Sequence, residues 1–416
     1  MTANYTKLNS ALNIGLLTPS FRGYNVQDGG IASHFAELAD ALAAEGHRVT
    51  VITSAPRTGS ARDTDPSHIA FAPFAIEMPR WLDRVTGLRW QLHSLAGLRH
   101  RAWRAARKLS LVETSRQLDI IETTSSGVLG LSYLQERHRA PIVTRISTTA
   151  AQLVEHNNSH PRWPERVEQR WERQLVEASD ARLTHTEHHR EAICQQWSLT
   201  KGSIALVPHG ITLPPAEDLP TTHDNTDVQV LFVGRFEHRK GIDTLLESIP
   251  LVLTRCQTVR FRLIGADAGN WRSKFWESHP TLRREQVEFS GNVGATELQA
   301  AYRNCDLFVA PSRYESFGLI YAEAMAWGKA AIGCRVGGVP EVIEHGATGY
   351  VIPPESPNAL ADAIVALVHD RNLRAAMGQA ARARVEKHFS HAALAAGSVA
   401  LYSEVIAATA ERRKTR

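Results

Sequence analysis

The stretch Val230–Ile249, VLFVGRFEHRKGIDTLLESI, predicts a strand, a glycine-bearing loop and a helix in that order. Its first four residues are apolar, and the apolar residues after Gly241 recur at helical spacing. Gly234 and Arg235 stand where the strand would end, and Lys240 lies directly before the predicted helix. An arginine fork and a lysine point charge at the carboxyl end of a strand suit a phosphate or diphosphate. The same side chains could instead be solvated surface charges.

The order of strand, loop and helix recurs along all 416 residues. Such alternation predicts an α/β protein with parallel sheets and helices on both faces. A segment rich in Pro, Thr and Asp, PPAEDLPTTHDNTD, divides the strand runs into two halves. We therefore expect two Rossmann-like, doubly wound domains facing a central cleft, because ligands bind outside the carboxyl ends of such strands. The predicted strand runs begin at Leu12, Val49, Asp119, Pro141, Ile204, Val228, Arg260, Val287, Asp306 and Ala330.

The bulk composition is ordinary for a globular protein, with 43% hydrophobic and 22% charged residues. The N-terminal residues lack the basic start, long apolar centre and cleavage site of a secretory signal, and no run approaches the roughly 18 apolar residues of a membrane span. These features predict a cytoplasmic protein without a nucleic-acid partner. The four cysteines have no paired spacing, so we expect them to be buried apolar residues: Cys194, Cys256, Cys305 and Cys334.

Positive charge is concentrated in residues 80–108, although the net charge of the chain is only +4. This segment holds eight Arg or Lys residues against one acid, Asp83, so it carries +7 and the remainder of the chain −3. Trp81, Trp90 and Trp103 are interleaved with the basic residues. Such a segment can contact an anionic membrane surface peripherally, here the inner membrane face. The alternative is a solvated helical face whose tryptophans pack on the domain.

Two further segments bear on ligand binding. Gly29 and Gly30 precede a helical pattern, and a glycine pair at a helix start lets the backbone approach an anion, although it is also a common way to begin a helix. The acidic triplet at residues 63–65, DTD, resembles a divalent-metal motif of some sugar-transfer enzymes. Because it follows no strand, we interpret it as a polar loop and expect no metal site.

Two glutamates, Glu315 and Glu323, lie in the segment PSRYESFGLIYAEAMAWG. If the whole interval were helical, the two Cα atoms would be roughly 12 Å apart. The two carboxyl groups of a glycoside hydrolase lie roughly 5 to 9.5 Å apart, so this spacing disfavours a hydrolytic acid and base. We expect instead that Glu315 lies in the loop and Glu323 about one and a half turns inside a helix. The pair then either binds two ends of one extended ligand or serves as a helix cap and a surface ion pair.

In these segments the chain resembles a family 4 glycosyltransferase of the GT-B fold, the group 1 type of retaining enzyme that uses nucleotide sugars. The resemblance runs over nearly the whole length. It is carried by GGIASHFAELADALAAEGHRVTVIT, VPHGI, FVGRFEHRKGIDTLLES, FSGNV, PSRYESFGLIYAEAMAWG and GGVPEVIEHGATGYVIPP. Two glutamates separated by seven residues are highly specific when the other segments accompany them.

The resemblance implies a domain organisation. Residues 1–213 would form an acceptor-binding domain, residues 214–227 a linker, and residues 228–394 a nucleotide-sugar-binding domain. Residues 395–416 would form a helix that packs back on the first domain.

The resemblance also implies residue roles. Arg235 and Lys240 match diphosphate-binding cations, and Glu315 matches the carboxylate beside the donor sugar; these three form the expected catalytic set. The other expected donor-binding residues are Gly29 and Gly30, near the diphosphate, and Gly234 and Ser316. Asn292 and Val293 would lie at the base, and Glu323 would bind the ribose. Phe317, Gly318 and Leu319 would act as backbone donors to the sugar and the phosphate. Cations and helix dipoles would stabilise the leaving diphosphate without a metal or other cofactor.

One position departs from the family pattern. Many relatives have a histidine near the donor sugar after the strand that corresponds to PIVTRI, whereas this chain has Arg145, Ile146 and Ser147. Ser147 or Arg145 would then contact the donor sugar or the acceptor.

The expected activity is transfer of a hexosyl unit, with retention, from a UDP- or GDP-sugar to an acceptor hydroxyl. Possible acceptors are lipid-linked or envelope glycans of polysaccharide biosynthesis. The alternatives are a GT-B nucleotide-sugar epimerase and a non-catalytic module that binds nucleotide sugar or glycan.

Overall fold

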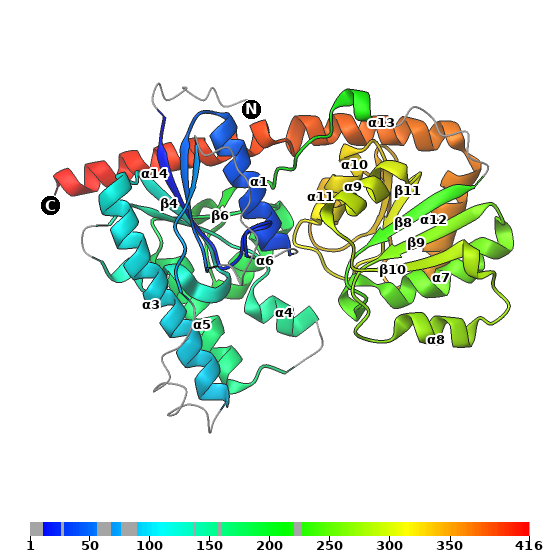
Figure 1. Ribbon diagram of the computed structural model, residues 1–416, viewed down its shortest axis with the longest axis horizontal. Coiled ribbons are helices and arrows are strands. Elements are labelled where there is room, and N and C mark those ends of the chain that lie inside the picture. Colours follow the sequence, from blue (N-terminus) through cyan, green and yellow to red (C-terminus); the bar gives the residue numbers. More distant parts are fainter. Residues whose placement is uncertain are drawn as a thin grey trace. The chain divides into compact units, whose positions relative to one another are not determined.

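The computed structural model describes residues 11–25, 29–55, 68–75, 90–136, 139–156, 160–219 and 227–415. The chain divides into two compact units. Unit 1 comprises Met1–His185, Arg190–Gly210 and His391–Arg416, and unit 2 comprises Thr186–His189 and Ile211–Ser390. Each unit is built on one parallel sheet with helices packed on it (Figure 1).

The sheet of unit 1 has the strand order β3-β2-β1-β4-β5-β6-β7. Its register pairs Ile14 with Val49 on one side and with Ile120 on the other, so β1 lies between β2 and β4. Strand order reverses between β1 and β4, which is where ligands of doubly wound sheets bind. The strands are β1 (Asn13–Leu17), β2 (Arg48–Ile52), β3 (Ile69–Phe71), β4 (Ile120–Thr124), β5 (Ile142–Arg145), β6 (Ala181–Thr184) and β7 (Ala205–Leu206).

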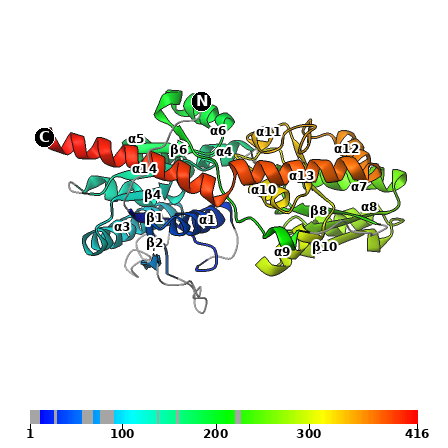
Figure 2. The ribbon, with the colours of Figure 1, turned by 90° about the horizontal axis from the view of Figure 1, so that it is seen from above.

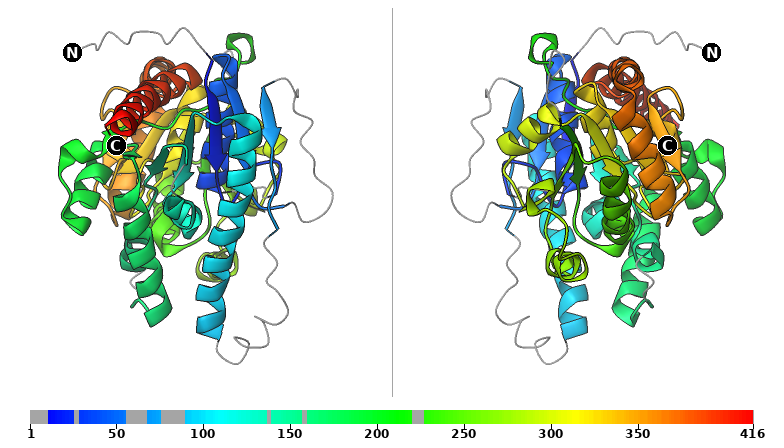
Figure 3. Two further views of the ribbon diagram at one scale, coloured as in Figure 1. Left: turned by 90° about the vertical axis from the view of Figure 1, so that its left-hand side faces the viewer. Right: turned by 90° about the vertical axis from the view of Figure 1, so that its right-hand side faces the viewer.

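The helices that accompany this sheet are α1 (Gly30–Ala44), α3 (Trp90–Arg116), α4 (Ala150–His156), α5 (Trp163–Ala178), α6 (Glu187–Trp197), whose first three residues are grouped with unit 2, and α14 (His391–Lys414). Helix α3 has buried positions at helical spacing, including Leu98, Ala102, Ala105 and Leu109, so one side of it packs on the unit. Helices α3 and α5 pack against each other (Figures 1 and 3).

The last helix, α14, packs along α1 in unit 1 (Figure 2). Its residues Leu394, Ala395, Tyr402 and Val405 belong to the same buried cluster as the side chains of α1. By its length and a mean hydropathy of 1.4 over its most apolar window, this helix is also able to cross a membrane, although it contains no unbroken apolar run of that length. One side of α14 is buried at helical spacing, and 28% of its most apolar window is buried in the structure.

The sheet of unit 2 has the order β10-β9-β8-β11-β12-β13, all parallel, and reverses between β8 and β11. The strands are β8 (Val228–Val233), β9 (Val259–Ile264), β10 (Val287–Gly291), β11 (Leu307–Ala310), β12 (Ala330–Cys334) and β13 (Gly349–Ile352). The helices are α7 (Ile242–Arg255), α8 (Trp271–Ser278), α9 (Ala295–Asn304), α10 (Leu319–Ala326), α11 (Val339–Val342), α12 (Pro357–His369) and α13 (Arg371–His388).

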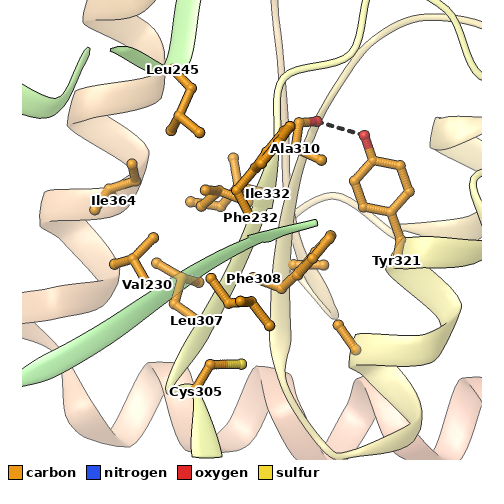
Figure 4. Packing of buried hydrophobic residues seen from close by; sticks show 14 of the residues in the cluster. Val230, Phe232, Leu245, Cys305, Leu307, Phe308, Ala310, Tyr321, Ile332 and Ile364 are labelled. Atoms are coloured by element: carbon orange, nitrogen blue, oxygen red, sulfur yellow. Dashed lines mark hydrogen bonds between the residues drawn. The ribbon is translucent and has the colours of Figure 1, made fainter. Parts of the chain in front are cut away.

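The core of unit 2 fills the space between this sheet and its helices (Figure 4). Val230 of β8, Phe308 of β11 and Ile332 of β12 are buried against side chains of the flanking helices. The Tyr321 hydroxyl of α10 donates to Ala310 O at 2.6 Å, which ties the start of α10 to the end of β11. Burial of this kind is the main stabilising contribution, at about 25 cal/mol per Å² of apolar surface.

The α/β fold with two parallel, Rossmann-like sheets confirms the prediction from strand alternation. Each of the ten predicted runs contains a strand. The prediction missed three strands: β3, β6 and β13. All four cysteines are buried and free, also as predicted.

Candidate active site

The candidate site in unit 2 begins at the loop between β8 and α7. Arg235 follows the strand, with its side chain 66% exposed and Nη2 placed 3.1 Å from Glu237 Oε1. Lys240 ends a short 3₁₀ turn, and Gly241 then adopts a left-handed conformation with φ at 67°. A Cβ at Gly241 would lie 1.9 Å from Pro311 O, so only glycine allows this loop to approach the segment after β11.

This close approach brings Lys240 and Glu315 together at the point where strand order reverses. Lys240 Nζ donates to Glu315 Oε1 at 2.5 Å, and Ser312 Oγ donates to the same oxygen at 2.9 Å. Glu315 is 8% exposed, so its carboxylate is held by buried partners. The sequence placed these residues in separate segments, and the structure joins them in one ion pair.

The surroundings of Glu315 favour its charged form. Burial alone would raise the pKa of this carboxyl group, but the charges of Lys240 and Arg239 and the hydrogen bonds from Lys240 and Ser312 outweigh that effect. The net result is a pKa below the usual value. Glu315 is therefore an anion that can stabilise positive charge or accept hydrogen bonds.

The start of α10 follows directly. Gly318 has φ at 94°, and a Cβ there would lie 2.5 Å from the Tyr321 ring. Phe317 is 2% exposed and packs edge-on against Phe389, so its ring belongs to the core of unit 2. Helix α10 begins at Leu319, and the first N–H groups of a helix have no partner within it. Ser316 is half-buried in the same loop.

Glu323 lies in the middle of α10, as predicted, while Glu315 lies in the loop before it. The Tyr302 hydroxyl donates to Glu323 Oε2 at 2.7 Å. Burial, together with the charge of Glu323, raises the pKa of Tyr302 well above its usual value, so the phenol remains a donor. The hydrogen bond from Tyr302 thereby holds the Glu323 carboxylate in a fixed orientation. Asn292 and Val293 directly follow β10; Asn292 is exposed, and Val293 packs on the core.

A supporting group of charges was missed from the sequence. Arg239 is buried and donates to Glu237 Oε1 at 2.9 Å and to Tyr314 O at 3.3 Å. Arg313 forms a two-pronged ion pair with Asp243 at 2.6 and 2.8 Å. These pairs connect the β8 loop to the β11 loop. Arg239 adjoins Lys240 in the sequence, but nothing in that spacing shows that Arg239 is the more buried of the two cations.

In unit 1, Gly29 precedes the first helical residue, Gly30, with φ at 140°. A Cβ at either glycine would meet no atom within 4 Å, so the backbone here is open to a ligand. Ser147 follows β5 and is half-buried, with Oγ 3.0 Å from Thr124 Oγ1. Both the Gly29 loop and Ser147 therefore lie beyond carboxyl ends of strands of the unit 1 sheet.

Arg145 has a different environment from the expected sugar contact. It is 1% exposed, its Nε donates to Glu122 Oε1 at 2.7 Å, and its Nη1 donates to Val207 O at 2.9 Å. Tyr402 Oη donates to the other oxygen of Glu122 at 2.5 Å. The expectation of a direct ligand contact is therefore not met for Arg145, because the side chain turns into the unit and joins β4, β5 and α14.

Within the described residues, no group of three or more His, Cys, Asp or Glu side chains is arranged to hold a metal ion. The acidic triplet at residues 63–65 lies outside those residues, as does the segment 80–89 with Asp83 and Trp81. The metal-independent reaction stays a prediction. So does every ligand role assigned above from the sequence.

Comparison with known proteins places this geometry in context. A family model described as Glycosyltransferase Family 4 matches residues 28–213, and one described as Glycosyl transferases group 1 matches residues 217–384. The D-inositol 3-phosphate glycosyltransferase of Corynebacterium glutamicum (strain R) is 27% identical over 289 residues, which cover 66% of this chain and 69% of that protein.

Two solved structures are similar over nearly the whole chain. Sucrose-phosphate synthase from Thermosynechococcus elongatus has a TM-score of 0.74 at 22% identity and covers 95% of this chain and 100% of its own. Anabaena HepE in complex with UDP and glucose has a TM-score of 0.67 at 19% identity, with 93% and 99% covered.

The fold and the matching families together define a glycosyltransferase of the GT-B type. The chain belongs to the family 4, group 1 glycosyltransferases, as the sequence motifs predicted.

Proposed function

We propose that this glycosyltransferase moves a hexosyl unit from a nucleoside diphosphate sugar to an acceptor hydroxyl, with retention at the anomeric carbon. The observation that carries the proposal is the pair of Lys240 and Glu315 at the strand reversal of unit 2, in which Lys240 stands on the same loop as the exposed cation Arg235. An ion pair of a lysine and a carboxylate, on a loop that carries a second cation, matches a ligand with an anionic diphosphate and a polar sugar.

In this proposal each residue has a separate task. Arg235 and Lys240 neutralise the diphosphate as its bond to the sugar breaks, which lowers the barrier without a metal ion. Glu315 accepts hydrogen bonds from the sugar hydroxyls, and the first N–H groups of α10 bind oxygens of the same ligand. Glu323, oriented by Tyr302, accepts from the ribose. The leaving diphosphate takes the proton of the acceptor hydroxyl on the face where the acceptor attacks.

The assignment of Gly29 and Gly30 to the donor follows from the family resemblance, and that of Ser147 from its place where many relatives have a histidine. For the nucleotide itself, HepE gives additional support, since it was solved with UDP and glucose. We propose a UDP-sugar as the first donor to test, with a GDP-sugar as the alternative.

A thermal-shift screen against UDP-glucose, UDP-galactose, UDP-N-acetylglucosamine and GDP-mannose tests the donor. A ligand present at 100 times its Kd stabilises the folded state by about 2.7 kcal/mol, which raises the melting temperature. The donor should lose this effect in Lys240→Ala and keep it in Lys387→Ala, an exposed lysine of the same unit. If no nucleotide sugar stabilises the wild-type protein, the proposed donor class is wrong.

Retention has its own measurement. The anomeric configuration of the product, determined by NMR, should equal that of the donor. An inverted product would contradict the retaining mechanism while leaving the donor assignment intact.

For the acceptor, we propose a lipid-linked or envelope glycan reached by a cytoplasmic enzyme at the inner membrane face. The support is helix α3, whose exposed side chains include Arg99, Arg101, Trp103 and Arg104. Trp103 is 45% exposed, and the guanidinium of Arg107 lies 5.1 Å from its ring centroid. Exposed arginines with an amphipathic ring suit the boundary between anionic headgroups and acyl chains.

Flotation with vesicles containing anionic lipid tests this contact. Neutralising Arg99, Arg101 and Arg104 together should remove association, because each basic residue contributes about 1 kcal/mol near such a surface. The matched control neutralises three exposed arginines of unit 2, Arg272, Arg283 and Arg303. Equal flotation of both triple variants would remove the membrane contact from the proposal.

A further inference from the structure

Unit 2 contains a second cavity, of about 420 Å³, that lies away from the candidate donor site. Two of its lining residues directly precede strands: Asp306 comes before β11, and Lys329 before β12. The donor-site loops instead follow the carboxyl ends of β8 and β11. Because all strands of this sheet are parallel, the cavity opens at the amino ends of the strands, whereas Lys240 and Glu315 lie beyond their carboxyl ends.

One wall of the cavity is a face of α13, and the other is the turn that follows α10. Helices α10 and α13 pack together (Figure 1). They approach closely because Gly378 of α13 lies on Gly328 of the turn: a Cβ at Gly378 would be 2.1 Å from Gly328 O. Gly328 itself has φ at 69°. Two glycines therefore place Lys329 against the helix.

Lys329 is the unusual member of the lining. It is 6% exposed, yet its Nζ makes no hydrogen bond or ion pair with any residue in the described part of the chain. Burial lowers the pKa of this amine, while nearby Cys305 and Asp306 raise it in part. Among the described residues, Nζ of Lys329 does not belong to the unpaired side-chain atoms that are closed to solvent, so the ammonium group faces the cavity.

Three arginines of α13 line the same cavity: Arg371, Arg374 and Arg382. Two of them are held in place by backbone carbonyls at helix ends. Arg374 Nη1 donates to Leu367 O at 2.5 Å, and Arg382 Nη1 donates to Ala326 O at 2.6 Å. With Lys329 these make four cations against the two acids of the lining, Asp306 and Glu386, an excess of two positive charges.

We propose that this cavity binds a small phosphate monoester, in which the dianionic phosphate pairs with Lys329 and the α13 arginines. The charge excess of two matches a phosphate monoester near neutral pH. The volume lies within the range of small-molecule pockets, about 300 to 1,000 Å³. Trp327, at the rim beside Lys329, offers an aromatic face to an attached polyol or sugar. The site is separate from donor binding and does not depend on the proposed transfer reaction.

Calorimetric titration of the full chain with glucose 6-phosphate tests the site. Saturating UDP is present throughout, so that the candidate donor site is occupied. We expect saturable binding that glucose does not reproduce and that inorganic phosphate competes away. Lys329→Met should weaken binding about tenfold or more, since one charge-assisted hydrogen bond is lost. Arg371→Ala, which changes an exposed position, should weaken it while leaving the fold intact.

Lys387→Ala on the same helix is the matched control and should bind as the wild type does, because Lys387 does not line the cavity. Lys240→Ala should also bind normally. Unchanged affinity in both Lys329→Met and Arg371→Ala would overturn the proposal. So would binding of glucose as tight as that of glucose 6-phosphate, or no binding by the wild type at millimolar concentrations.

Discussion

Both units contain a pair of a cation and a carboxylate, but the two pairs differ in where they stand on the sheet. In unit 1 Arg145 and Glu122 are residues of strands β5 and β4, and their side chains are 2% and 0% exposed. In unit 2 Lys240 and Glu315 stand on loops beyond β8 and β11, with side chains 15% and 10% exposed. A ligand can reach the second pair and replace one partner. The first pair holds neighbouring elements together.

The largest expected effect comes from breaking the pair of unit 1. Arg145→Leu would leave Glu122 buried without its cation, which typically costs about 3–5 kcal/mol of stability. Urea denaturation should show this loss. Adding Glu122→Gln to Arg145→Leu should restore part of it, because the uncompensated charge is removed. Lys201→Leu, which breaks the exposed pair with Glu191, should cost less than about 1 kcal/mol. Equal losses for Arg145→Leu and Lys201→Leu would show that burial does not distinguish these pairs.

Breaking the pair of unit 2 should change activity more than stability. We expect Lys240→Ala to lower kcat about 10²–10³-fold, the usual cost of removing one preorganised donor to a developing charge. Lys387→Ala should keep wild-type turnover. Steady-state kinetics with the donor identified by thermal shift provides the measurement. If kcat for Lys240→Ala stays within twofold of the wild type, the diphosphate assignment is wrong.

Glu323 should affect donor binding rather than the chemical step. Glu323→Gln keeps the shape of the side chain and its contact with Tyr302 but removes the charge that strengthens hydrogen bonds to hydroxyls. We expect KM for the donor to rise about tenfold with kcat nearly unchanged. Glu277→Gln, an exposed glutamate of α8, is the control. A fall in kcat with unchanged KM would move Glu323 from the ribose to the reacting centre.

The two units should also respond to pH in opposite directions. In unit 1 burial raises the pKa of Glu172 to about 7, although Ser125 and the Ala150 N–H donate to it. Between its ordinary value of 4.5 and 7 the folded state binds more protons than the unfolded state, so stability falls as pH rises. Relative to Glu172→Gln, the wild type should lose at most about 1.4 kcal/mol per pH unit, measured by urea denaturation between pH 5 and 7.

For Glu315 in unit 2 the pH dependence of stability has the opposite sign. Its pKa is lowered on folding, so its contribution is complete above the ordinary value of 4.5 and is lost as pH falls through the lower, folded value. The stability difference between the wild type and Glu315→Gln should therefore shrink below pH 4.5. If both glutamates show the same sign of pH dependence, the contrast between the two carboxylate environments is wrong.

Local patterns in the sequence predicted most strands of the two sheets, and the strands that were missed show where such patterns no longer predict a strand. Residues 230–233 of β8 and all of β11 are continuous apolar runs, which parallel strands buried on both faces require. Strand β6 has only four residues, ARLT, and two of them are half-buried. Strand β3 is shorter still and wholly half-buried. Strands this short carry no periodic pattern, so they form only because neighbouring strands supply the hydrogen bonds.

The candidate site was predictable in its parts but not in its contacts. Spacing showed that Glu315 and Glu323 are poorly suited as a hydrolytic pair, and the motifs gave them separate expected roles. The family resemblance suggested a ligand contact for Arg145, because many relatives have a histidine near the donor sugar at this place in the chain. Its side chain instead points into the unit, because Glu122 on the adjacent strand and Tyr402, 280 residues beyond Glu122, provide buried partners. A pairing across that separation leaves no local trace in one sequence.

By itself the sequence determined the α/β class, the two halves, the family and the residues of the Lys240 loop, because these follow from periodicity and local motifs. Only the tertiary structure decided which charges are paired and which are open. Gly241 lets two loops approach and joins Lys240 to Glu315, while Gly378 and Gly328 bring Lys329 to the wall of a second cavity. Ion pairs and cavities depend on distances between segments far apart in the chain, and these distances exist only once the sheets and helices have packed.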